Sequence, residues 1–112
     1  MLRILKAFQY ALQGIFHALR NEFAFQIEFS LALILIPLSF FIGENAVEVA
    51  FLVFSTLFIL IVELLNTSIE KTLDRYNKDK NELTGIAKDY ASGAVLLSIV
   101  NWIITWGLVL FI

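Results

Sequence analysis

The sequence predicts an all-α membrane protein: one membrane domain over residues 1–112, with an N-terminal amphipathic helix at the membrane surface and three transmembrane helices. Two observations lead to this prediction. First, the 112 residues are 60% hydrophobic and only 16% charged, whereas the residues of soluble domains are about 25% charged. Second, long apolar stretches lie at 23–42, 46–62 and 90–112, and each approaches or exceeds the roughly 20 residues that a helix needs to cross a bilayer.

Residues 1–20 are expected to form a helix that lies on the membrane rather than through it. They are too polar to span, yet apolar side chains recur at helical spacing opposite polar and basic ones. The apolar side consists of Leu5, Phe8, Leu12, Ile15, Phe16 and Leu19, and the polar side of Lys6, Gln9, Gln13, His17 and Arg20. Such a helix suits the interface, where basic side chains meet lipid headgroups. A helix packed on a soluble core would show the same pattern, but the chain offers no soluble core for it to join.

The three predicted spans belong to helices of different polarity. The helix at 23–42 is apolar apart from polar residues near its start. The helix at 46–76 continues beyond its apolar part into a polar segment, so we expect it to leave the membrane and extend into water. The helix at 82–112 carries charged residues in its first turns and none from residue 90 onward.

The distribution of basic residues predicts the orientation. All eight Lys and Arg residues lie at Arg3, Lys6 and Arg20 or within 71–88, whereas the turn at 43–48 carries two glutamates and no basic residue. Cytoplasmic segments of membrane proteins are enriched in Lys and Arg. The N-terminus and the 71–88 segment are therefore expected in the cytoplasm, and the C-terminus on the far side.

Several kinds of site are excluded by composition. The chain has no cysteine, so disulfides and thiolate metal sites are absent, and the single His17 cannot form a histidine metal cluster. The five glycines are scattered singly, so neither a Walker loop nor a Gly-rich kinase loop is present. Nothing suggests a nucleic-acid-binding surface. Any chemistry must therefore rest on other polar side chains, chiefly carboxylates.

The polar continuation of the second span carries the strongest functional candidates. Ionisable groups at membrane depth cost roughly 2.5–3.5 kcal/mol on insertion scales, so they suggest function by default. At about 100° per residue, one arc of roughly 80° on this helix holds Glu63, Asn66, Glu70 and Asp74. A solvated helix end would explain Asp74 equally well. It explains Glu63 poorly, because residues 58–62 just before it are apolar.

Further candidates lie at the start of the first and third spans. Glu22 lies where the amphipathic helix meets the first span, and Glu28 lies about one and a half turns deeper. An ordinary interface role explains Glu28 equally well. Asp89 suits the dipole at a helix N-terminus, whereas the dipole disfavours the neighbouring cation Lys88, which favours an anionic partner for it. Ser92 lies near the same face about one turn on.

Acidic residues near a lysine at a membrane surface suit a particular chemistry. Carboxylates hold a divalent metal that carries a polyphosphate, and a further carboxylate accepts a proton from a hydroxyl group. Magnesium is the natural metal, because oxygen atoms are the ligands that the chain offers. Proton relay or ion transport would also use intramembrane acids, so composition and spacing leave both possibilities open.

Six segments together resemble the signature of the prokaryotic diacylglycerol kinase family. They are NEFAFQIE at 21–28, ELLNTSIE at 63–70, DR at 74–75, ELTGIAKD at 82–89, SGAVLL at 92–97 and ITW at 104–106. The segments follow the family's order, with compatible spacing, over nearly the whole chain. The resemblance implies a homotrimeric kinase with active sites shared between subunits, which uses magnesium and ATP to phosphorylate the hydroxyl group of diacylglycerol.

The resemblance also implies roles for individual residues. Glu63 is the catalytic base, and Glu22 and Glu70 hold the metal and the ATP phosphates. Asn66 orients Glu63 or the substrate. Further ATP contacts are implied for Arg3, Tyr10, Asp79, Asn81, Lys88 and Asp89, and contacts with the lipid substrate for Glu28, Glu63, Asn66 and Ser92.

Two short segments depart from the family's usual pattern. Asp79-Lys80-Asn81 stands where Glu-Tyr-His is usual, which affects the contacts that this loop makes with adenosine. Gln26-Ile27 stands where Arg-Gln is common, which affects the contacts with the lipid headgroup.

We therefore expect the reaction ATP + diacylglycerol → ADP + phosphatidate at the cytoplasmic face of a bacterial inner membrane. The expected partners are membrane lipid and further copies of the chain, and no nucleic acid. Undecaprenol kinase shares these motifs and is the nearest alternative. A non-catalytic transporter or scaffold with an acidic proton path is the alternative from another class, and a transporter would move its substrate without consuming ATP.

Overall fold

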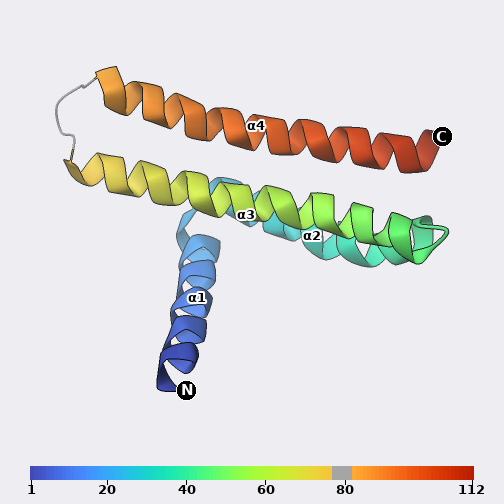
Figure 1. Cartoon of the computed structure of the whole chain (residues 1–112), viewed down its shortest axis with the longest axis horizontal. Helices are drawn as coiled ribbons and strands as arrows, with labels where there is room; N and C mark the ends of the chain where they lie inside the picture. Colours follow the sequence, from blue (N-terminus) through green and yellow to red (C-terminus); the bar gives the residue numbers. More distant parts are fainter. Residues whose placement is uncertain (77–81) are drawn as a thin grey trace.

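The computed structural model describes residues 1–76 and 82–112, and all of its secondary structure is helical. The helices are α1 (Leu2–Asn21), α2 (Phe23–Ile42), α3 (Ala46–Tyr76) and α4 (Glu82–Phe111) (Figure 1). These bounds agree with the predicted helices to within a residue at each end. The predicted all-α fold, with one N-terminal helix followed by three longer or more apolar ones, is confirmed.

Helices α2, α3 and α4 run alongside one another, and α1 projects from them at a steep angle (Figure 1). α3 is the central helix, because it packs against both α2 and α4. α2, α3 and α4 are each long and apolar enough to cross a membrane. This arrangement matches three spans with an amphipathic helix turned away from them, as expected for a helix that lies along the membrane surface.

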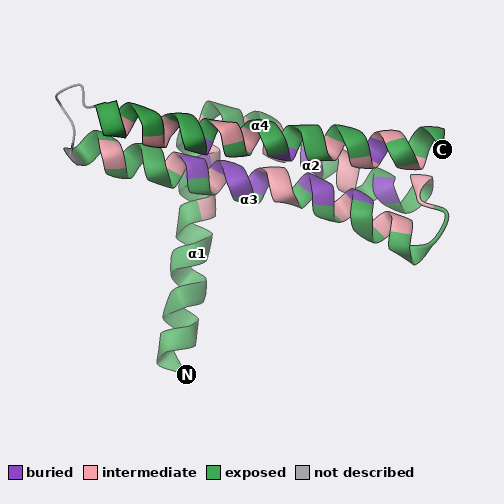
Figure 2. Cartoon of the chain, turned by 45° about the horizontal axis from the view of Figure 1, so that its top comes forward, coloured by how far each residue is buried: buried purple, intermediate pink, exposed green. Residues whose placement is uncertain are grey.

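The surface of the bundle is apolar, and several of its most buried side chains are polar or small. Large hydrophobic residues such as Phe40, Phe51 and Leu97 are well exposed, whereas Ser39, Ser55 and Ser98 are at most 1% exposed (Figure 2). In lipid, burying apolar surface between helices has no hydrophobic driving force, and small residues allow the close helix packing that holds helices together there. The exposure pattern is therefore that of a protein whose solvent is lipid.

The turn between α2 and α3 is tightly built. Asn45 Oδ1 accepts a hydrogen bond from the backbone N–H of Glu48 at 2.9 Å, and Glu48 Oε1 accepts one from the N–H of Glu44 at 3.1 Å. This reciprocal pattern resembles a capping box, which satisfies free N–H groups at a helix start. A Cβ atom on Gly43 would lie 2.6 Å from Val49 Cγ2, so this close reversal of the chain needs glycine.

The C-terminal half of α1 is anchored to the spans by an apolar cluster. Ala18 of α1, Phe25 and Ala32 of α2, and Leu60 of α3 form its buried centre. Partly buried side chains around them are Ile15, Leu19, Phe29, Ile36 and Leu64. This cluster fixes the junction of α1 and α2 against α3, at the level where the acidic residues of α3 begin.

Candidate active site

The predicted polar face of α3 is a connected group in the structure. The Asn66 amide donates one hydrogen bond to Glu63 Oε2 at 3.2 Å and another to Glu70 Oε1 at 2.7 Å. Glu63 is 6% exposed and Asn66 is 9% exposed. One amide therefore holds the two carboxylates in a row, and the deeper carboxylate is buried in the bundle.

Glu28 of α2 joins this group from the side. Its carboxyl group lies close enough to that of Glu63 for the two to interact electrostatically. Two buried acceptors remain without a partner among the described residues, Glu28 Oε1 and Asn66 Oδ1. Buried acceptors are usually satisfied in proteins, so a ligand with an O–H or N–H donor would suit this group.

An apolar cavity of about 240 Å³ begins at Glu28 and runs between α2, α3 and α4. Its other lining residues are Leu31, Ala32, Leu35, Thr56, Ile59, Ile99 and Trp102. The Trp102 indole donates a hydrogen bond to Thr56 Oγ1 at 3.1 Å, which leaves the lining without a free polar group at that point. The cavity therefore leads from a carboxyl group into an apolar space.

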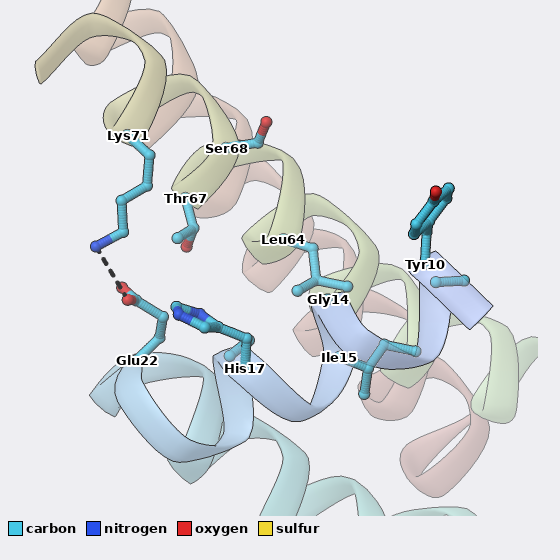
Figure 3. A pocket seen from close by; sticks show the side chains of 11 residues that line it. Tyr10, Gly14, Ile15, His17, Glu22, Leu64, Thr67, Ser68 and Lys71 are labelled. Carbon is cyan, nitrogen blue, oxygen red and sulfur yellow. Dashed lines mark ion pairs between the residues drawn. The ribbon is translucent and has the colours of Figure 1, made fainter. Parts of the chain in front are cut away.

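Glu22 occupies the junction between α1 and α2 and faces α3. Its carboxylate pairs with the Lys71 ammonium at 3.3 Å (Figure 3). Both residues line a cavity of about 490 Å³ between α1 and α3, together with Tyr10, His17, Thr67, Ser68 and five further residues. The structure thus places Tyr10 and Glu22, two predicted nucleotide contacts, on one cavity.

Lys88 has an anionic partner, as its position at a helix start suggested. Its ammonium lies 2.6 Å from Asp74 Oδ1, and this ion pair joins α4 to α3. Both side chains are well exposed, so the pair contributes little to stability. Asp74 therefore has a partner on α4, and its place on the polar face of α3 stays the argument for a functional role.

Three predicted site residues are exposed in the single chain. Asp89 and Ser92 are exposed on α4, and Arg3 is exposed in the first turn of α1. Arg3 lines a cavity of about 460 Å³ with Tyr10. Their roles stay predictions. Asp79 and Asn81, predicted to contact ATP, lie outside the described residues.

Sequence reasoning missed Lys71 as a site residue. In the sequence this lysine is only one basic residue of a segment expected in the cytoplasm, and its partner Glu22 lies 49 positions earlier, so the pairing depends on the fold. The available signal was its position next to Glu70 on a helix whose polar face was already assigned. Thr56 and Trp102 were missed for the same reason, because their pairing depends on how α3 and α4 pack.

The magnesium ion implied by the resemblance can be compared with the side chains present. Among residues 1–76 and 82–112, no group of three or more His, Cys, Asp and Glu side chains is arranged to hold a metal ion. Magnesium in phosphotransfer sites usually takes one or two carboxylates, with phosphates and water completing its shell. Glu22 pairs with the Lys71 ammonium group, and Glu70 directly precedes Lys71 in α3. Glu22 and Glu70 supply carboxylate oxygens, the kind of ligand that magnesium prefers.

Comparison with known proteins identifies the family. The family model described as prokaryotic diacylglycerol kinase matches residues 9–110. A protein of Haemophilus influenzae named diacylglycerol kinase is 41% identical over 108 residues, covering 96% of this chain and 92% of its own. Proteins of the same name from Escherichia coli and Pseudomonas aeruginosa are 37% and 38% identical, covering 97% and 96% of this chain and 89% and 88% of their own. The chain therefore belongs to the prokaryotic diacylglycerol kinase family.

Proposed function

We propose that this kinase transfers the γ-phosphoryl group of ATP to the hydroxyl group of diacylglycerol, giving ADP and phosphatidate, at the cytoplasmic face of a bacterial inner membrane. The single observation that carries the proposal is the group of Glu28, Glu63, Asn66 and Glu70, in which Glu63 and Asn66 are buried, in a chain of this family. A lipid hydroxyl group would meet a carboxylate there, at membrane depth.

In the proposed reaction Glu63 accepts the proton of the diacylglycerol hydroxyl group. The hydroxyl oxygen forms a bond with the γ-phosphorus of ATP, and the bond between that phosphorus and the bridging oxygen of ADP breaks. The Asn66 amide keeps the Glu63 carboxylate oriented through its 3.2 Å hydrogen bond. Because positioning and charge stabilisation carry most of phosphoryl transfer, this small chain needs no conventional nucleotide domain.

Glu22 and Glu70 are the proposed ligands of magnesium, and magnesium would neutralise charge on the phosphates of bound ATP. Both carboxylates lie toward the water-exposed end of α3. Glu70 follows Glu63 by about two turns, and Glu22 pairs with Lys71, the residue after Glu70. ATP therefore approaches from water and the lipid from the membrane, and Glu63 lies between the two. Tyr10, Arg3, Lys88 and Asp89 are proposed to contact the nucleotide.

The apolar cavity beside Glu28 supports a lipid substrate. It extends from the carboxyl group between α2, α3 and α4 and is lined almost entirely by apolar side chains. A glycerol hydroxyl group near Glu28 and Glu63 would leave an acyl chain free to follow this space. We propose that Glu28, with Ser92, contacts the glycerol end of the substrate.

Homotrimeric assembly with shared active sites completes the proposal. Asp89 and Ser92 are exposed on α4, and Arg3 is exposed on α1, so each can face a neighbouring copy. The apolar surfaces of the spans are a weaker argument, because lipid covers such surfaces equally well. The exposed polar residues are therefore what supports a site completed by a second copy.

The orientation can be tested by labelling, because the chain has no cysteine of its own. Glu44→Cys places a thiol in the turn between α2 and α3, and Lys6→Cys places one on α1. A membrane-impermeant maleimide should label the first variant on intact spheroplasts and the second only after permeabilisation. The opposite pattern would put the acidic group of α3 on the outer side and remove the cytoplasmic assignment.

The proposed activity is tested by following a phosphoryl group. The purified protein in mixed micelles receives ATP labelled at the γ-phosphate, magnesium and diacylglycerol, and the lipid product is identified by mass spectrometry. We expect labelled phosphatidate, with no label in lipid when magnesium is omitted. Absence of labelled lipid at every magnesium concentration would reject the proposed activity and favour a non-catalytic role, which flux assays in liposomes would then address.

A further inference from the structure

Lys71 makes an ion pair that joins α3 to the junction of α1 and α2. Its ammonium lies 3.3 Å from Glu22 Oε2 (Figure 3). The Lys71 side chain is 65% exposed, and that of Glu22 is 23% exposed. The proposed function gives Lys71 no role, although it contacts a proposed metal ligand and adjoins another, Glu70.

A lysine on a metal-binding carboxylate has a direct consequence. The ammonium group and a divalent cation repel each other, so both cannot bind the same Glu22 oxygen closely. An ion pair this exposed is weak, and therefore a metal ion that arrives with ATP can displace the ammonium group. Lys71 must then find another partner or lose its ion pair to water.

The surroundings of Lys71 offer a place for that partner. The side chain borders the cavity of about 490 Å³ between α1 and α3, which Tyr10 and Thr67 also line. Lysine is a point charge on a flexible stem and suits a polyphosphate that changes its position. A phosphate oxygen close to a metal on Glu22 would lie within reach of the released ammonium group.

We propose that Lys71 is a nucleotide-binding residue that exchanges partners when the nucleotide binds. In the free enzyme it neutralises Glu22 and holds the junction of α1 and α2 against α3. When metal and nucleotide enter, the ammonium group leaves Glu22 and pairs with the polyphosphate. This inference rests on the proposed role of Glu22 in metal binding.

The test uses the full-length protein in micelles, with the non-hydrolysable analogue AMP-PCP and Mn²⁺ followed by electron paramagnetic resonance. Without nucleotide, Lys71→Met should bind Mn²⁺ roughly two- to fivefold more tightly than the wild type, the gain expected from losing a weak competitor. With AMP-PCP, the same variant should bind the nucleotide about tenfold more weakly, because a charged hydrogen bond is lost. Lys71→Arg should restore both values toward those of the wild type.

Arg20→Met is the matched control. It removes one positive charge two residues from Glu22 without removing the ion pair. If Lys71→Met and the wild type bind Mn²⁺ equally well, or if neither binds it detectably, the proposed competition is overturned. If Lys71→Met binds AMP-PCP as tightly as the wild type does, the proposed contact with phosphate is overturned. Effects of the same size in Arg20→Met would show that loss of any nearby positive charge explains both results, and would overturn the specific role of Lys71. Glu22→Gln separates the two proposals: unchanged metal binding with nucleotide would reject Glu22 as a ligand, whatever Lys71 does.

Discussion

Replacing Glu63 with Gln is expected to lower turnover by roughly 10²–10⁴-fold, the contribution typical of a general base. Glutamine has nearly the same size and keeps an oxygen that can accept a hydrogen bond from Asn66. In the wild type this bond joins the Asn66 amide to Glu63 Oε2 at 3.2 Å. It cannot accept a proton from the lipid hydroxyl group. The packing around a residue that is 6% exposed should therefore persist while the chemistry fails.

The measurement is the steady-state turnover of Glu63→Gln with diacylglycerol and Mg-ATP, together with the oligomeric mass by light scattering. We expect the mass of a trimer for both wild type and variant. Glu48→Gln is the matched control, because it makes the same chemical change in the turn at the other end of α3 and keeps an acceptor for the Glu44 N–H. Near-normal turnover of Glu63→Gln would remove Glu63 from the role of base.

Replacing Asn66 with Asp is expected to lower turnover about 100-fold, since two hydrogen bonds to charged groups are lost at once. The amide donates to Glu63 at 3.2 Å and to Glu70 at 2.7 Å. An ionised aspartate has no donor, so three carboxylates would repel one another in a row on one helix face. The base and the proposed metal ligand should both lose their orientation.

Asn66→Asp is followed by turnover and by Mn²⁺ binding in the presence of AMP-PCP. Asn45→Asp makes the same change where Asn45 Oδ1 only accepts a hydrogen bond from Glu48 N–H, and aspartate caps helices as well as asparagine does. That control should keep wild-type turnover. If Asn66→Asp matched it, the amide bridge would be structural and would not position the catalytic groups.

Most of the fold was predictable because each helix carries its own signal. Hydropathy predicted the three spans, and the 3.6-residue period predicted α1 and the polar face of α3. The order of Glu63, Asn66 and Glu70 on that face depends only on helical geometry, and their hydrogen bonds confirm it. Local geometry was enough wherever the interacting residues lie on one helix.

Contacts between helices were not predictable in the same way. The contact of Glu28 with Glu63, the pairing of Lys71 with Glu22 and the hydrogen bond from Trp102 to Thr56 each depend on how two elements pack. Helical periodicity fixes a direction around one axis and contains no information about the neighbouring axis. Lys88 is intermediate, because its position at a helix start suggested an anionic partner but did not identify Asp74.

The central claim, that this chain is a diacylglycerol kinase, is tested most directly by ADP release from the purified protein in mixed micelles with Mg-ATP. Three samples are compared: diacylglycerol, undecaprenol and no added lipid. The account predicts fast release with diacylglycerol, slower release with undecaprenol and only background without lipid. Faster release with undecaprenol would contradict the assigned substrate while keeping the chemistry, and release at background level in all three samples would contradict the kinase itself.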